Sequence, residues 1–307
     1  MTGWEKTAIL LLAHGSPESA ADVPEFMRNI TSGRAIPQEA MDEVSHRYGL
    51  IGRSPLTDIT MAQAAALSRQ LDLPVYVGMR NWKPYITTAV KEMVSDGITQ
   101  AVAICLAPQN SRTSVGLYRR AAFAEAGSDL KIEFIDAWHD HPLLIKAFAE
   151  QLCTAWDNAC EEAGCKVAVI FTAHSVPCRT IQGGDPYGSQ AKETASLVAK
   201  HVGGIDDWSF AFQSQGMSGG TWIGPTVEET ILAYKSEGHR GVLIDPVGFV
   251  CDHVEVLYDI DISFKQFTAH QGMKLWRTQS LNTSASFIDA LADLARGRMG
   301  CFQVSAS

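Results

Sequence analysis

Two stretches of the chain share one pattern, a run of apolar residues that ends in an Ala-His loop. Ala8 to Leu12 leads into Ala13-His14-Gly15-Ser16-Pro17, and Val167 to Phe171 leads, after Thr172, into Ala173-His174-Ser175-Val176-Pro177. Because each run is continuously apolar rather than alternating, it predicts a parallel strand buried on both faces and followed by a Pro-marked loop. The same device therefore occurs once in each half of the chain.

A second correspondence links the two halves. Val90 to Gly97 precedes the apolar run Ala101 to Ala107, and Ile231 to Gly238 precedes the apolar run Val242 to Ile244. Each pair predicts a helix that a glycine closes in the left-handed conformation, followed by a strand. The chain is therefore interpreted as an internal duplication.

Amphipathic helices alternate with the predicted strands, as in Asp58 to Leu71 and Lys192 to His201. This alternation predicts an α/β fold with two parallel sheets, each covered by helices on both faces. A helical stretch from Leu143 to Glu162 ends near Gly164, and we place the domains at residues 1–150 and 151–307. Ligands of such sheets bind outside the carboxyl ends of the strands, so both Ala-His loops are expected to face one cleft.

The composition excludes several classes of protein. The 307 residues are 46% hydrophobic and 19% charged, with a net charge of −9, and no stripe of Lys or Arg could follow a phosphate backbone. We therefore expect no nucleic-acid partner. No apolar run reaches the roughly 18 residues of a transmembrane segment, so a cytoplasmic location is expected. Glycine-rich dinucleotide and P-loop motifs do not occur.

A histidine and a row of carboxylates are the candidate chemistry. His174 ends an apolar run, and Asp252, Glu255 and Asp259 are spaced to share one face of a helix. An imidazole with a carboxylate suits Fe(II), Co(II), Ni(II) or Zn(II), and two ligands make a weak site that can release its metal. The plainer alternatives remain open, since a strand-end histidine is often only a hydrogen-bonded loop residue and an acidic helix face is often only solvated.

Several segments resemble one family. Phe171 to Pro177 and Pro246 to Asp259 resemble the two signature segments of the ferrochelatases. Further matches follow in the same order, namely Gly52-Arg53-Ser54-Pro55-Leu56, Leu106-Ala107-Pro108, Gly184-Asp185-Pro186-Tyr187 and Trp222-Ile223-Gly224-Pro225. The resemblance covers nearly the whole chain. It implies a chelatase-like fold of two Rossmann-like domains around a porphyrin cleft, with Fe(II) and a porphyrin as substrates and haem as product.

The resemblance also implies roles for individual residues. His174 and Glu255 match the family's metal-insertion pair, with His174 as a base and Glu255 holding iron or passing protons toward Asp259. The positions that contact the porphyrin and its propionates fall on His14, Arg47, Ser54 and Tyr118.

The sequence of the second signature segment most resembles that of the coproporphyrin ferrochelatases of the Gram-positive-type haem route. This resemblance favours coproporphyrin III over protoporphyrin IX as the substrate. Two departures stand out. His14 occupies a position where many of those enzymes carry a tyrosine that binds iron axially, and Thr31 and Ser32 replace a basic pair. Imidazole is itself a good iron ligand, so axial ligation by His14 is chemically plausible.

Four of the seven cysteines suggest a second metal group. By the same resemblance, the candidate ligands of a [2Fe–2S] cluster are Cys153, Cys160, Cys165 and Cys301. The alternative is four reduced thiols of a cytosolic protein. Transient contact with neighbouring haem-pathway enzymes is also expected.

Two other functions fit parts of the pattern. A sirohydrochlorin chelatase that inserts cobalt, nickel or iron would share the fold and a histidine-based site, but the Asp252 to Asp259 segment favours a ferrochelatase. A non-catalytic tetrapyrrole carrier would need saturated ligation, whereas an open His/Glu pair suits turnover.

Overall fold

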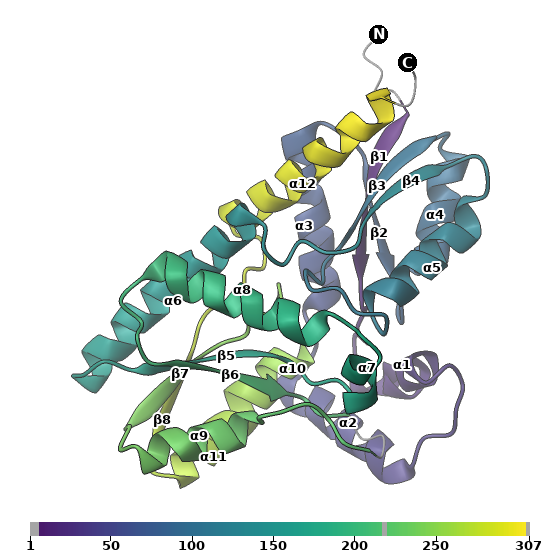
Figure 1. Cartoon of the computed structure of the whole chain (residues 1–307). Helices are drawn as coiled ribbons and strands as arrows, with labels where there is room; N and C mark the ends of the chain where they lie inside the picture. Colours follow the sequence, from purple (N-terminus) through teal and green to yellow (C-terminus); the bar gives the residue numbers. More distant parts are fainter. Residues whose placement is uncertain (1–5, 217–219, 305–307) are drawn as a thin grey trace.

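The computed structural model describes residues 6–216 and 220–304 and contains two parallel four-stranded sheets flanked by helices (Figure 1). The first sheet has the order β2 (Val75–Met79), β1 (Thr7–Ala13), β3 (Gln100–Cys105), β4 (Lys131–Ile135). The second has the order β6 (Trp208–Gln213), β5 (Ala168–His174), β7 (Gly241–Asp245), β8 (Lys274–Arg277). The second order repeats the first with β5 in the place of β1. The predicted duplicated α/β fold is confirmed.

The continuous apolar runs are explained by burial on both faces of each sheet. In β1, Ile9 and Leu11 contribute to a core that lies between the two sheets, while Leu10 and Leu12 contribute to a core under the outer helices. Strand β5 behaves in the same way. Alternate side chains of a strand point to opposite faces, so helices on both sides of a sheet make most positions of its strands apolar.

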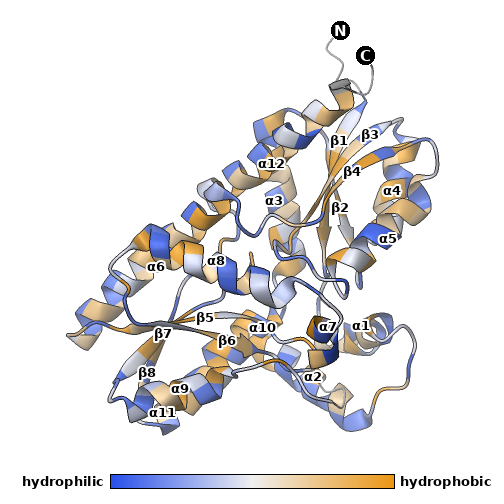
Figure 2. Ribbon diagram, viewed as in Figure 1, coloured by the Kyte–Doolittle hydropathy of each residue, from blue (hydrophilic) through white to orange (hydrophobic). Residues whose placement is uncertain are grey.

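The helices cover both sheets and carry hydrophobic and hydrophilic residues together (Figure 2). Those of the first half are a short 3₁₀ turn (Ala20–Asp22), α1 (Val23–Ile30), α2 (Gln38–Ile51), α3 (Leu56–Leu71), α4 (Ile86–Ser95) and α5 (Val115–Ala126). The second half has α6 (Pro142–Ala163), α7 (Cys178–Gln182), α8 (Tyr187–Val202), α9 (Val227–Ser236), α10 (Val254–Leu257), a π-helix (Asp259–Phe264), α11 (Lys265–His270) and α12 (Ala285–Val304). Gly97 and Gly238 have φ of 78° and 92°, so the predicted left-handed caps are confirmed.

The two halves share one core. Helix α6 packs against α8, and α12 packs against α6, α3 and β3. Figure 1 shows α12 running back beside the first sheet, to end near the chain termini. Residue 150 lies inside α6, and the last helix of the chain contacts the first sheet. The division at residues 1–150 and 151–307 therefore stays a prediction.

Within residues 6–216 and 220–304, none of the helices is both long enough and apolar enough to cross a bilayer.

A buried carboxyl at the end of β7 makes stability depend on pH. Asp245 is 1% exposed, its Oδ1 accepts a hydrogen bond of 2.9 Å from Thr278, and its Oδ2 has no partner among the described residues. Burial raises the pKa of Asp245 from 3.8 to about 7. Between these two values the folded protein binds more protons than the unfolded chain, so the contribution of Asp245 to stability falls as the pH rises.

We therefore expect Asp245→Asn to remove this pH dependence. Urea unfolding of the variant and of the unsubstituted protein at about pH 4 and about pH 7 measures it. The stability of the variant relative to the unsubstituted protein should rise with pH across that interval. A difference in unfolding free energy that is the same at both values would contradict the prediction.

Candidate active site

Histidines from both halves gather with one carboxylate at the carboxyl ends of the strands. His14 follows β1, His174 is the last residue of β5, and Glu255 lies in α10, after the loop that leaves β7. The imidazoles of His14 and His174 both interact electrostatically with the carboxyl group of Glu255. The structure therefore brings together three of the residues singled out in the sequence, from three distant segments.

Two glycines allow the loops of this cluster to pack closely. Gly15 has φ of 85°, and a Cβ there would lie 2.8 Å from the amide nitrogen of Trp82. A Cβ on Gly248 would lie 2.5 Å from the Cβ of Ala173, and the amide of Gly248 donates to the carbonyl of Thr172. The loop after β7 thus lies directly against β5, next to His174, which explains a glycine at this point of the segment.

The ring of His174 is held in one tautomer. Its Nδ1 forms a hydrogen bond with the carbonyl oxygen of Ser175. A carbonyl oxygen only accepts, so Nδ1 carries the hydrogen and Nε2 of the neutral ring keeps its lone pair. The side chain is half-buried. In its neutral form, His174 therefore presents Nε2 as the nitrogen that can take up a proton or a metal ion.

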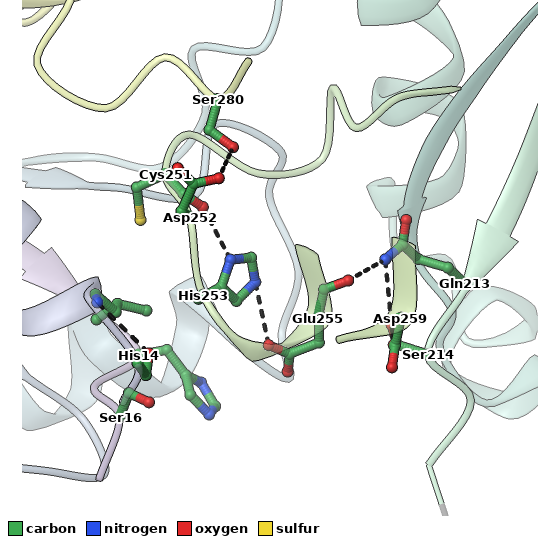
Figure 3. Close-up of polar contacts among 12 residues, drawn as sticks. His14, Ser16, Gln213, Ser214, Cys251, Asp252, His253, Glu255, Asp259 and Ser280 are labelled. Carbon is green, nitrogen blue, oxygen red and sulfur yellow. Dashed lines mark hydrogen bonds and ion pairs between the residues drawn. The ribbon is translucent and has the colours of Figure 1, made fainter. Parts of the chain in front are cut away.

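Glu255 is held from both sides, as Figure 3 shows. Its backbone carbonyl accepts a hydrogen bond of 2.8 Å from Nε2 of Gln213, whose Oε1 accepts one of 2.6 Å from Thr172. Its Oε2 lies 3.2 Å from Nε2 of His253, and Nδ1 of His253 lies 2.9 Å from the carbonyl oxygen of Cys251. Since Nδ1 donates to that carbonyl, Nε2 is the ring nitrogen of His253 that pairs with Glu255.

The two carboxyl groups nearest the cluster have opposite pKa shifts. Burial alone would raise the pKa of Glu255, but the imidazoles of His253, His174 and His14 outweigh it and lower that pKa. Burial raises the pKa of Asp259 to about 6, and the charge of Glu255 adds to the effect, while a hydrogen bond from Ser214 opposes it. Asp259 can therefore exchange a proton close to neutral pH beside an ionised Glu255.

Asp252 does not share the face expected for it. Helix α10 begins at Val254, so Asp252 precedes it. Its carboxylate accepts hydrogen bonds from Ser280 at 2.7 Å and Asn282 at 2.8 Å and is paired with Arg277. The row of three carboxylates predicted from the spacing is thus wrong, because α10 starts two residues later and Arg277, the last residue of β8, pairs with Asp252.

His14 lies opposite these groups and is exposed to solvent (Figure 3). The side-chain nitrogen Nδ2 of Asn81 lies 3.3 Å from Nδ1 and 3.2 Å from Nε2 of the His14 ring. Although the side chain is exposed, nearby protein groups displace part of the water around the ring, and this desolvation, opposed by the charge of Glu255 and reinforced by those of His174 and His253, lowers the pKa of His14 to about 4. The ring is therefore neutral at physiological pH and able to bind a metal ion.

The other three residues expected to contact a porphyrin are already engaged within the protein. Arg47, on α2, pairs with Glu43 at 2.8 Å and with Asp259 at 3.3 Å. Ser54 is 2% exposed and precedes α3. Tyr118 is 3% exposed, and burial raises its pKa. Their roles stay predictions.

The four candidate cluster cysteines do not form one ligand set. Cys153 and Cys160 lie on α6, Cys165 follows it, and Cys301 lies near the end of α12. Figure 1 shows the far ends of these two helices at opposite sides of the molecule. Across residues 6–216 and 220–304, no three His, Cys, Asp or Glu side chains are grouped so that they could hold a metal ion. These residues do not fit a [2Fe–2S] cluster.

Two neighbours of the cluster were not singled out in the sequence. His253 stands two residues before Glu255, and a histidine at that spacing was a usable signal. Asn81 contacts His14 from the loop after β2, and its backbone amide donates to the carbonyl of His14. No pattern in the sequence marks Asn81, because only the pairing of β1 with β2 brings it there.

Two duplicated α/β halves with a cluster of imidazoles and carboxylates at the strand ends define a protein of the chelatase fold. Solved structures agree: the sirohydrochlorin chelatase SirB from Bacillus subtilis subspecies spizizenii, in complex with cobalt, aligns with a TM-score of 0.60 over 95% of each chain. The identity is 12%, so this likeness shows the fold alone.

Sequence comparison identifies the family. The profile described as Ferrochelatase matches residues 6–299. A ferrochelatase of Acidobacterium capsulatum is 56% identical over 98% of this chain and 97% of its own length. A coproporphyrin III ferrochelatase of a Geobacillus species is 36% identical over 96% of this chain and 98% of its own. The chain belongs to the ferrochelatase family, the enzymes that insert iron into a porphyrin in haem synthesis.

Proposed function

We propose that this enzyme inserts Fe(II) into coproporphyrin III, with His174 and Glu255 acting on the same face of the macrocycle. The observation that carries the site assignment is the position of His14 after β1, His174 at the end of β5 and Glu255 after the loop that leaves β7, where the charges of both imidazoles act on Glu255. It supports a cluster whose groups can bind a metal ion weakly and accept protons.

The reaction requires proton acceptors, because Fe(II) replaces two protons on the pyrrole nitrogens. Nε2 of His174 takes one of these protons, since its lone pair is kept free by the bond of Nδ1 to Ser175. The second proton passes to Glu255 and on to Asp259, whose pKa of about 6 suits uptake near neutrality. The product is haem-type iron porphyrin and two released protons.

His14 is proposed to bind the iron from the opposite face of the ring. Its low pKa keeps the imidazole neutral, so no proton has to leave before a metal is bound. Asn81 orients the ring of His14 by its contacts with the ring nitrogens. An axial ligand on that face would hold the iron once Glu255 releases it.

The choice of coproporphyrin rests on relatives. Proteins of two Geobacillus strains named coproporphyrin III ferrochelatase are 36% and 37% identical to the chain. The amino-acid sequence from Pro246 to Asp259, which resembles the signature segment of those enzymes, supports the same substrate. The relative with 56% identity carries only the name ferrochelatase.

An anaerobic assay of Fe(II) insertion tests the proposal. We expect kcat/KM for coproporphyrin III to exceed that for protoporphyrin IX by at least about tenfold, the effect of a binding difference of about 1.4 kcal/mol. Equal or reversed preference would contradict the coproporphyrin assignment. Activity only with sirohydrochlorin and cobalt, nickel or iron would replace it with the sirohydrochlorin alternative.

Two further expectations stay predictions of this proposal, namely the cytoplasmic location and transient contact with neighbouring haem-pathway enzymes. The proposal includes no iron–sulfur cluster, because the described cysteines are not grouped as its ligands. The protein as isolated should therefore lack the visible absorption of such a cluster.

A further inference from the structure

We propose that a pocket beside His14 binds one carboxylate arm of the porphyrin through the guanidinium groups of Arg28 and Arg80. The proposal rests on the proposed function, since it assumes that a porphyrin occupies the cleft. It names two residues that recognise the substrate by charge.

The pocket has a volume of about 460 Å³ and lies between α1, the end of β2 and the start of α4. Its polar lining is provided by Arg28, Asn29, Ser32, Arg80 and Thr87, together with the hydroxyl-bearing Tyr85. None of the lining residues is acidic. A negatively charged group would therefore meet attraction without repulsion.

Both guanidinium groups lack a counter-ion in the part of the chain that the structure describes. Neither Arg28 nor Arg80 forms an ion pair there, and Nε of Arg80 is buried without a hydrogen-bond partner. Arg47, by contrast, is held by Glu43 and Asp259. In a protein with a net charge of −9, two unpaired arginines in one pocket point to a bound anion.

The start of α4 strengthens the preference for negative charge. Tyr85, the residue that precedes the first turn, makes no capping hydrogen bond with its side chain. The first amides of this ten-residue helix, at Ile86 and Thr87, therefore lack a side-chain acceptor. Helix dipoles attract anions at this end.

Hydrogen bonds connect the lining of the pocket to His14. The side chain of Asn29 donates 3.0 Å hydrogen bonds to the carbonyl of Asn81 and to the hydroxyl of Tyr85. Asn81 in turn contacts the ring of His14. The charge of Arg80 also acts on His14 and Tyr118. A carboxylate on a flexible arm at the edge of a macrocycle beside His14 is the anion that this arrangement fits.

Equilibrium binding of coproporphyrin III and of its tetramethyl ester, followed by fluorescence, tests the proposal. We expect Arg28→Ala and Arg80→Ala each to weaken binding of the free acid about 10- to 100-fold, as for a charge-assisted hydrogen bond. Binding of the ester should stay unchanged. Arg28→Lys should retain part of the affinity. Arg69 is exposed on α3, so Arg69→Ala is the control for the loss of one positive charge and should leave binding unchanged.

Three results would overturn the inference. They are unchanged binding of the free acid, an equal loss for acid and ester, and loss of inorganic phosphate binding alone, which would mark a site for a free anion. Iron insertion by the unsubstituted protein is measured alongside. If iron insertion is absent with every porphyrin, the proposed function is wrong. If insertion is normal and the variants bind the free acid as the unsubstituted protein does, only the inference about the pocket is wrong.

Discussion

His174→Ala is expected to reduce iron insertion by about 10²- to 10⁴-fold while porphyrin binding stays close to normal. The side chain supplies Nε2, whose lone pair is free when the ring is neutral because Nδ1 bonds to the carbonyl of Ser175, whereas Nε2 of His253 is already paired with Glu255. The strand itself should remain intact, because its partners are backbone groups of β6 and β7. Anaerobic insertion rates and fluorescence quenching of the bound porphyrin measure the two effects separately.

The matched control for this variant is His201→Ala, since His201 is exposed near the end of α8. It should leave both rate and binding unchanged. Added imidazole should restore part of the activity of His174→Ala if the ring acts chemically. Normal turnover by His174→Ala would remove the base from the mechanism.

Glu255→Gln should be the second large effect, again about 10²- to 10⁴-fold in the insertion rate. The amide keeps the shape of the side chain and its place beside His253, but it neither carries a negative charge nor accepts a proton. Loss of that charge also removes a cause of the raised pKa of Asp259. The pKa of Asp259 should therefore fall, and the pH profile of the residual activity should change with it.

Glu161→Gln provides the comparison, because Glu161 is exposed on α6, away from the cluster. It should show the rate and the pH profile of the unsubstituted protein. A Glu255→Gln enzyme with the full rate, or with a lower rate that follows only weaker porphyrin binding, would assign Glu255 to substrate positioning alone.

The strands and their duplication could be predicted because burial on both faces leaves a direct trace in the sequence. The runs Ala8 to Ala13 and Val167 to Phe171, which precede His14 and His174, are apolar at every position, and each side of these strands meets a hydrophobic core. The domain boundary left no such trace. Helices α6 and α12 lie in a core common to both halves, so composition does not change where one half ends.

The site could be predicted only where one segment carries its own signal. His174 and Glu255 stand in long segments that resemble a known family, and the fold brings them together. The spacing of Asp252 was misleading, because periodicity does not reveal where a helix begins or that Arg277 at the end of β8 and Asn282 after it would contact Asp252. The unpaired state of Arg28 and Arg80 depends on tertiary contacts and has no counterpart in the sequence.

A crystal structure of the protein with coproporphyrin III bound is the most direct test of the site. The imidazole of His174 and the carboxyl group of Glu255 should face the same side of the macrocycle, within hydrogen-bonding or metal-binding reach of its central nitrogens. His14 should face the other side. A porphyrin bound elsewhere, or a ring that separates His174 from Glu255, would contradict the account.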